Sequence, residues 1–138
     1  MDSLIQNETF ILTTLPEGRN SVEGRWVYTI KEGSDGAKTY KTRYVAKGYS
    51  QVKGIDYQET FSPTVNLISV RALFQIAAQH DLSLHQMNAY LNAPIDCEIY
   101  MDRAEGFEAP SSSNGKPVYK LNKSLYGLKQ SGRNWNNV

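Results

Sequence analysis

The chain has 138 residues, which suits one domain of ordinary size. Its content of 40% apolar and 11% aromatic residues excludes a disordered tail, and its net charge of +1 gives no indication of a strongly charged partner. A folded domain with its own core is therefore expected.

The first third of the sequence predicts a short helix followed by a β-hairpin. Residues 1–15 have the pattern of a short amphipathic helix that runs into Phe10. Residues 26–30 are aromatic and β-branched, residues 32–36 contain the glycine and aspartate of a hairpin turn, and residues 40–47 return as a second strand. Alternation along this second strand places its basic side chains on one face, namely Lys41, Arg43 and Lys47.

The rest of the sequence mixes helical and strand patterns. Residues 54–64 are irregular, and residues 67–80 have the broad apolar face of a helix. Residues 125–138 are partly helical, with no capping glycine or closing turn. Short strands are expected at 82–87, 98–101 and 118–121. These elements together predict an α+β fold.

Charged residues are segregated along the chain. Residues 19–53 hold eight lysines or arginines against three acidic residues, residues 54–110 hold two against eight, and residues 111–138 hold five against none. Basic surface beside clustered carboxylates suits an enzyme that holds phosphates near metal ions. Solvated loops that carry these charges are the simpler alternative.

Three features of the sequence bear on the cellular compartment of the protein. The single cysteine, Cys97, excludes an internal disulfide, which suits a reducing compartment. No apolar run approaches the roughly 20 residues that span a bilayer. The N-terminus lacks the basic and apolar regions of a signal peptide. We expect a soluble intracellular protein of the cytoplasm or nucleus, without a membrane partner.

Several longer strings are more specific than any short motif. They include Arg25-Trp-Val-Tyr, Tyr44-Val-Ala-Lys-Gly-Tyr-Ser-Gln51, Gly54-Ile-Asp-Tyr-Gln-Glu-Thr-Phe-Ser-Pro63, Ala89-Tyr-Leu-Asn-Ala-Pro94, Glu98-Ile-Tyr-Met101 and Lys120-Leu-Asn-Lys-Ser-Leu-Tyr-Gly-Leu-Lys-Gln130. In order and spacing they resemble the N-terminal half of the reverse transcriptase domain of copia-type retrotransposons. The resemblance extends from about Ser3 to the end of the chain.

The resemblance implies part of a polymerase right hand, an incomplete α+β fold with the fingers and the first part of the palm. Residues 1–138 would then be a fragment of one domain, fingers-like over 1–66 and the start of the palm with the remaining fingers over 67–138. The implied partners are an RNA or DNA template-primer and a deoxynucleotide. In the family, two Mg²⁺ ions about 4 Å apart assist attack of the primer hydroxyl on the nucleotide.

The resemblance also implies that this chain lacks the metal ligands. In the family an aspartate follows the strand that contains His85-Gln-Met87, whereas here Asn88 follows Met87 and three residues are missing. The second aspartate pair of the family belongs to a hairpin beyond Val138. We therefore expect no catalytic residue, no bound Mg²⁺ and no DNA synthesis. A substitute metal site among the acids (Asp56, Glu59, Asp96, Glu98, Asp102, Glu105), or a zinc site at His80 and His85, is a remote alternative.

Four residues match nucleotide-binding positions of the family. By resemblance, Arg43 and Lys47 would grip the triphosphate, Tyr90 would test the sugar 2′ position, and Gln130 would touch the incoming nucleotide. The structural alternatives are a solvated strand face for the two cations, a core tyrosine and a surface amide.

Three functional interpretations remain open at this stage. The chain is an inactive remnant of a mobile element, or a nucleic-acid-binding module that uses the basic fingers hairpin, or the product of an incomplete gene model for a full enzyme. Its oligomeric state is unknown. Strong salt dependence of binding would favour the second interpretation.

Overall fold

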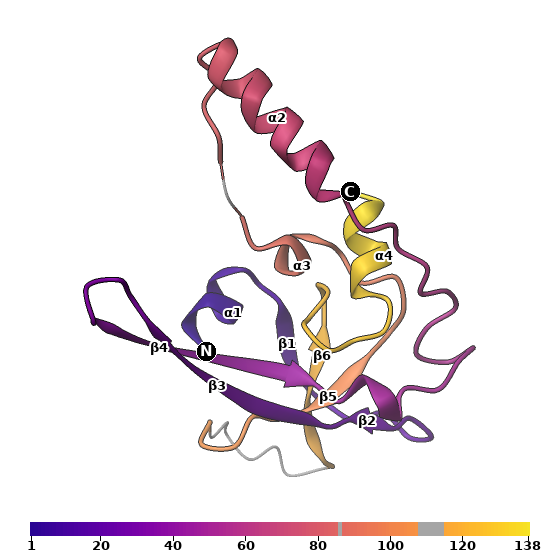
Figure 1. Ribbon diagram of the computed structural model, residues 1–138. Helices are drawn as coiled ribbons and strands as arrows, with labels where there is room; N and C mark the ends of the chain where they lie inside the picture. The colour runs from indigo at the N-terminus through magenta and orange to yellow at the C-terminus, as the bar shows by residue number, and fades with distance from the viewer. Residues whose placement is uncertain (86, 108–114) are drawn as a thin grey trace.

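The computed structural model describes residues 1–85, 87–107 and 115–138 and shows a mixture of helices and strands (Figure 1). The strands form one four-stranded sheet and one two-stranded sheet. The elements are α1 (Asp2–Gln6), β1 (Phe10–Thr14), β2 (Ser21–Val22), β3 (Gly24–Glu32), β4 (Lys38–Ala46), a 3-10 turn η1 (Gly48–Ser50), α2 (Leu67–Gln79), α3 (Ala89–Asn92), β5 (Tyr100–Asp102), β6 (Pro117–Leu121) and α4 (Ser131–Asn136).

The predicted hairpin is confirmed as the antiparallel pair β3–β4. Trp26 lies opposite Tyr44, and their ring centroids are 5.1 Å apart. The turn between the strands is closed by Asp35, whose carboxylate accepts a hydrogen bond from the main-chain nitrogen of Ala37 at 3.1 Å. An aspartate that binds backbone two residues on is typical of such turns.

The four-stranded sheet has the order β1-β6-β5-β2, with β1 and β5 antiparallel to β6 and β2 parallel to β5. It combines strands from both ends of the chain. The helix predicted over residues 1–15 is only partly correct, since α1 ends at Gln6 and Phe10–Thr14 forms β1. Pairing with β6 decides the outcome, because Phe10 lies 4.0 Å from the ring of Tyr119.

The core lies between the hairpin, the four-stranded sheet and the segment after β6. Its buried members come from these three parts, from α3 and from residues that flank β5: Val22, Tyr44, Ala46, Leu91, Ile99, Met101, Ala104, Tyr119, Leu121, Leu125 and Leu128. Met1 and Leu4 of the N-terminal segment pack against this cluster. None of the helices in the described parts of the chain is long and apolar enough to cross a membrane.

Two glycines allow the end of β4 to lie directly against the segment after β6. A Cβ atom on Gly48 would lie 2.0 Å from the carbonyl oxygen of Gly127, and one on Gly127 would lie 2.0 Å from that of Ala46. Gly127 also has φ of +95°, which favours glycine. In this crossing the main-chain nitrogen of Ala46 donates to the carbonyl oxygen of Tyr126 at 2.8 Å.

Helix α2 confirms the helix predicted over 67–80 but extends away from the rest of the molecule (Figure 1). Asn66 caps it, because its side chain accepts a hydrogen bond from the nitrogen of Ile68 at 3.0 Å. Only Ala77 of this helix is buried. Its exposed apolar residues are Leu67, Ile68, Leu73, Phe74 and Ile76.

The strand predicted over 82–87 is wrong for the residues that the structure describes. Residues 82–85 and 87 are irregular, and Leu82, Leu84 and Met87 are exposed. Alternating polar and apolar residues form a strand only where a neighbouring strand binds them, and no described strand pairs with this segment. Gln86 and residues 108–114 lie outside the described residues. Most of the loop expected around residue 110 therefore lies outside them too.

The glycine crossing predicts a position-specific loss of stability. Gly127→Ala should lower the free energy of unfolding by more than about 2 kcal/mol, since it adds a clash with Ala46 to the unfavourable positive φ. Gly36→Ala is the matched control, because Gly36 has φ of +76° but open space around its Cα. It should lose only about 1–2 kcal/mol. Urea unfolding followed by tryptophan fluorescence measures both, and equal losses would contradict the crossing.

Candidate nucleotide-binding pocket

Strand β4 brings the basic side chains to the candidate site. Lys41 and Arg43 pair in register with Thr29 and Val27 of β3, so both lie on one face of the hairpin. Lys47 follows the strand and is engaged elsewhere, because its ammonium binds the Glu23 carboxylate at 2.6 Å. This hydrogen bond and the charge of Glu23 raise the pKa of Lys47. Only Lys41 and Arg43 of the three reach the pocket described next.

Three side chains from distant segments meet beside β4. The guanidinium carbon of Arg43 lies 5.9 Å from the ring centroid of Tyr126. The ring of Tyr126 lies 4.9 Å from that of Tyr90, at an interplanar angle of 60°. A cation within about 6 Å of an aromatic ring is attracted by the negative face of the ring. Arg43 and Tyr90, which the sequence predicts as site residues, are thus linked through Tyr126.

A cavity of about 220 Å³ lies at this meeting point. Its lining combines the cationic side chains of Lys41 and Arg43 and the amide of Asn88 with apolar and aromatic side chains: Met1, Leu4, Trp26, Tyr44, Leu91, Leu125 and Tyr126. Tyr90 is not part of this lining but contacts the ring of Tyr126. Two cations among apolar and aromatic side chains suit a ligand that has both an anionic group and a planar ring.

Tyr44 forms a rigid part of the same wall. Its hydroxyl donates a hydrogen bond to the main-chain oxygen of Asp102 at 2.9 Å. Burial, with smaller contributions from the charge of Asp102 and from Tyr119, raises the pKa of Tyr44 from 10.0 to about 12. Tyr44 therefore stays neutral at physiological pH and keeps this hydrogen bond.

Asn88 is the residue that the resemblance predicts in place of a metal-binding aspartate. It lies at the start of α3, is exposed, and borders the cavity. Its main-chain oxygen accepts a hydrogen bond from the side chain of Asn92 at 2.8 Å. A neutral amide offers a metal ion one carbonyl oxygen and no charge, so this position suits a hydrogen bond to a ligand better than Mg²⁺.

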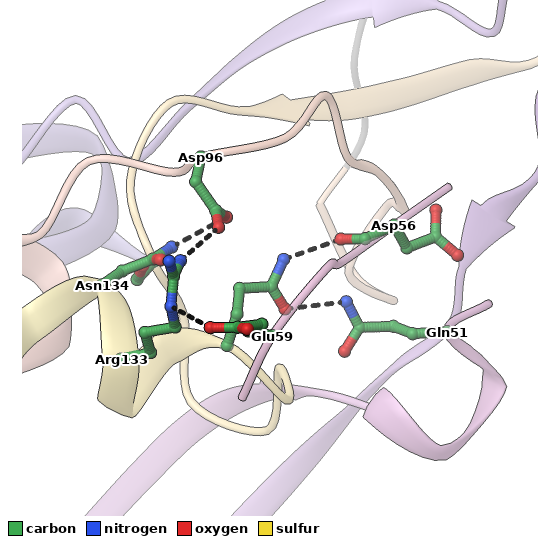
Figure 2. A network of polar contacts seen from close by, with 8 residues as sticks. Gln51, Asp56, Glu59, Asp96, Arg133 and Asn134 are labelled. Carbon is green, nitrogen blue, oxygen red and sulfur yellow. Dashed lines mark hydrogen bonds and ion pairs between the residues drawn. The ribbon is translucent and has the colours of Figure 1, made fainter. Parts of the chain in front are cut away.

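Gln130 lies in a buried polar network and does not border the cavity. Its side chain is 0% exposed, donates to the main-chain oxygen of Asp56 at 2.7 Å and accepts from the amide of Gln51 at 3.1 Å. Gln51 in turn accepts from the nitrogen of Lys129 at 2.8 Å. Figure 2 shows Gln51 and Asp56 in this network. Both ends of the Gln130 amide are therefore occupied within the protein.

A second part of the network joins α4 to two loops (Figure 2). Arg133 lies 3.7 Å from Glu59 and 3.4 Å from Asp96. The buried Asn134 donates to Asp96 at 3.1 Å and to Ser124 at 3.2 Å. Buried amides are tolerated only when their hydrogen bonds are made, so these contacts hold the loops in one arrangement.

Several of the residues considered as metal ligands form ion pairs or are exposed to solvent. Glu59 and Asp96 share Arg133, and His80 and His85 are exposed. Two further acids pair with lysines: Glu98 with Lys120, and Asp102 with Lys116 at 2.6 Å. Within residues 1–85, 87–107 and 115–138, no group of three or more His, Cys, Asp or Glu side chains is placed to hold a metal ion.

Comparison with known proteins decides the family. Residues 7–138 match the family described as reverse transcriptase (RNA-dependent DNA polymerase). The chain belongs to this reverse transcriptase family. Its similarity to plant transposon proteins confirms the resemblance to the copia type.

Three plant proteins are among the relatives that this chain resembles. The chain is 43% identical over 139 residues to the retrovirus-related Pol polyprotein from transposon TNT 1-94 of Nicotiana tabacum, and 39% identical over 140 residues to that from transposon RE1 of Arabidopsis thaliana. These alignments cover 98% of this chain but only 10% and 9% of the relatives. An uncharacterized mitochondrial protein of Arabidopsis thaliana is 39% identical over 80 residues, which is 57% of this chain and 47% of that protein. No solved structure was found to match.

The four residues predicted to bind the nucleotide do not all lie together in the structure. Arg43 and Tyr90 come together, whereas Lys47 binds Glu23 and Gln130 is buried in the polar network. Tyr126 was missed, although it lies in the family string that ends at Gln130. No periodicity or motif rule singles out one tyrosine of that string, because its role depends on the crossing that brings it to β4.

The buried network predicts that Gln130 matters for stability. Gln130→Ala should lower the free energy of unfolding by about 2–3 kcal/mol, because Gln51 and the carbonyl of Asp56 lose buried partners. Gln58→Ala is the control, since the exposed Gln58 makes one contact of 3.4 Å with Gly54. It should change stability by less than about 0.5 kcal/mol. Urea unfolding measures both, and similar values for the two variants would exclude a structural role for Gln130.

Proposed function

We propose that this chain forms the nucleotide-binding fingers of a copia-type reverse transcriptase domain, with the palm beginning after residue 66. The single observation that supports this proposal best is the Arg43 guanidinium over the ring of Tyr126, 5.9 Å from its centroid, beside a cavity that Lys41 also borders. A guanidinium attracted to the face of a ring still has N–H donors available for phosphate oxygens. The apolar wall of the cavity suits the base or sugar of the same ligand.

We further propose that this chain does not itself catalyse DNA synthesis. The residues of the cavity do not fit Mg²⁺, since none of the described residues that border it is a carboxylate and two of them are cations. Asn88 cannot neutralise the charge of a divalent ion. These residues therefore bind the nucleotide but do not catalyse its addition to DNA.

The binding proposal predicts selective loss on substitution of Arg43. Arg43→Ala should weaken binding of deoxythymidine triphosphate by about 2 kcal/mol, because charged hydrogen bonds to phosphate are lost. Arg25→Ala is the control, since it removes the same charge from the neighbouring strand outside the cavity. Isothermal titration calorimetry with EDTA present measures both. Equal weakening by the two variants would indicate general charge attraction and would contradict the pocket.

The proposal about chemistry predicts the outcome of a primer-extension assay. With a homopolymer template, primer, deoxynucleotide and Mg²⁺, this chain should give no product above background. Asn88→Asp should also give none, because one carboxylate beside two cations is too little to hold two metal ions. Processive synthesis by the unmodified chain would overturn this part of the proposal.

A second candidate function, binding of single-stranded nucleic acid, is favoured by the two faces of the β3–β4 hairpin. One face exposes Tyr28, Ile30 and Tyr40, at 72%, 63% and 73%. Lys38 lies on this same face by the alternation of the strands, whereas Lys31, Lys41 and Arg43 lie on the opposite face. Exposed aromatic rings that stack on bases, combined with cations for phosphates, are typical of sites for single strands.

The hairpin predicts a salt-sensitive interaction that depends on its tyrosines. Tyr28→Ser with Tyr40→Ser should weaken binding of a labelled oligothymidine by about 1–3 kcal/mol for each stacked base. Tyr49→Ser is the control, since Tyr49 is 78% exposed but lies outside the hairpin. Fluorescence anisotropy at several salt concentrations measures both effects. Binding that does not respond to salt or to the tyrosines would exclude this function.

A further inference from the structure

We propose that Tyr126 is the positioning residue of this pocket: its ring holds the Arg43 guanidinium in the orientation that receives the phosphates of a bound nucleotide. This inference rests on the proposed nucleotide binding and adds a residue to which the sequence assigns no role. Tyr126 borders the cavity together with Arg43. Its contribution would be indirect, through the arginine.

The backbone of Tyr126 is fixed independently of any ligand. Its carbonyl oxygen accepts a hydrogen bond from the nitrogen of Ala46 at 2.8 Å. The neighbouring Gly127 leaves no room for a side chain against β4. Leu125 and Leu128 on either side are 2% and 6% exposed. The ring therefore projects from an anchored segment, and not from a free loop.

The ring of Tyr126 also has an aromatic neighbour. Tyr90 lies against it at 4.9 Å, in a tilted arrangement that aromatic pairs prefer. The other two rings of the cavity wall are paired with each other, since Trp26 lies 5.1 Å from Tyr44. Of the rings that border the cavity, Tyr126 is thus the one that carries the Arg43 cation.

Holding an arginine in place matters because its side chain has many rotamers. Ordering a long side chain when a ligand binds costs free energy, and a preorganised side chain avoids part of that cost. A guanidinium near the face of a ring can still donate hydrogen bonds, since its donors lie in the plane of the group. Tyr126 should therefore strengthen contacts to phosphate without touching the phosphate itself.

The test compares three ligands: thymidine, its monophosphate and its triphosphate, measured by calorimetry in EDTA. Tyr126→Leu should weaken triphosphate binding about fivefold more than it weakens thymidine binding. Tyr126→Phe keeps the ring and should bind like the unmodified chain. Tyr57→Leu is the matched control, because it removes another ring–cation pair, with Lys129 at 4.8 Å, away from the cavity. It should bind the triphosphate normally.

A double-substitution cycle separates positioning from a merely structural role. In an Arg43→Ala background, Tyr126→Leu should cause no further loss of triphosphate binding, since the ring then has no arginine to hold. An undiminished further loss, equal weakening of thymidine binding, or a phenylalanine variant as weak as the leucine variant would each overturn the inference. Should Tyr126→Leu fail to unfold cooperatively in urea, Tyr126→Met supplies similar bulk without a ring face and is judged by the same outcomes.

The outcomes for Tyr126 and for the proposed function are distinct. If the unmodified chain binds no triphosphate, or if Arg43→Ala binds as well as the unmodified chain, both proposals are overturned. If Arg43→Ala weakens binding but Tyr126→Leu does not, nucleotide binding stands and only the positioning role is overturned.

Discussion

The structure depends on one close approach between two main-chain segments. At Gly48 and Gly127 the end of β4 lies against the segment after β6, with the hydrogen bond from Ala46 to Tyr126 beside it. Without side chains at these two points, residues about 80 apart in the chain can pack backbone to backbone. The hairpin, the four-stranded sheet and the segment that contains Tyr126 then share one core.

The same approach produces the candidate site. Arg43 comes from the hairpin and Tyr126 from the segment after β6, so neither forms a binding wall alone. The buried amides of Gln51 and Gln130 lie on the other side of this junction and join the two segments through hydrogen bonds. A polar core of this kind specifies a single arrangement, because any shift leaves buried donors or acceptors without partners.

The sequence predicts what local patterns control. The β3–β4 hairpin and helix α2 follow from alternation and periodicity, and the family strings single out Arg43 as a candidate. Contacts between distant segments are beyond such patterns. From the sequence, Gln130 is predicted to be a surface amide or a ligand contact. Its burial depends on Gln51, which lies 79 residues earlier and which no local pattern connects with it. The strand expected after α2 fails for a related reason, since no described neighbour supplies its hydrogen bonds.

Helix α2 has a consequence for local dynamics. An isolated helix shorter than about 12–15 residues is marginal in water, because propagation barely offsets the cost of nucleation. The 13 residues of α2 obtain little help from packing, since only Ala77 is buried. Its amide hydrogens are therefore expected to exchange with solvent well before those of β4 or β6. Burial of its apolar residues against another surface would stabilise this helix. Slower hydrogen exchange in α2 would therefore indicate that an apolar surface packs against it.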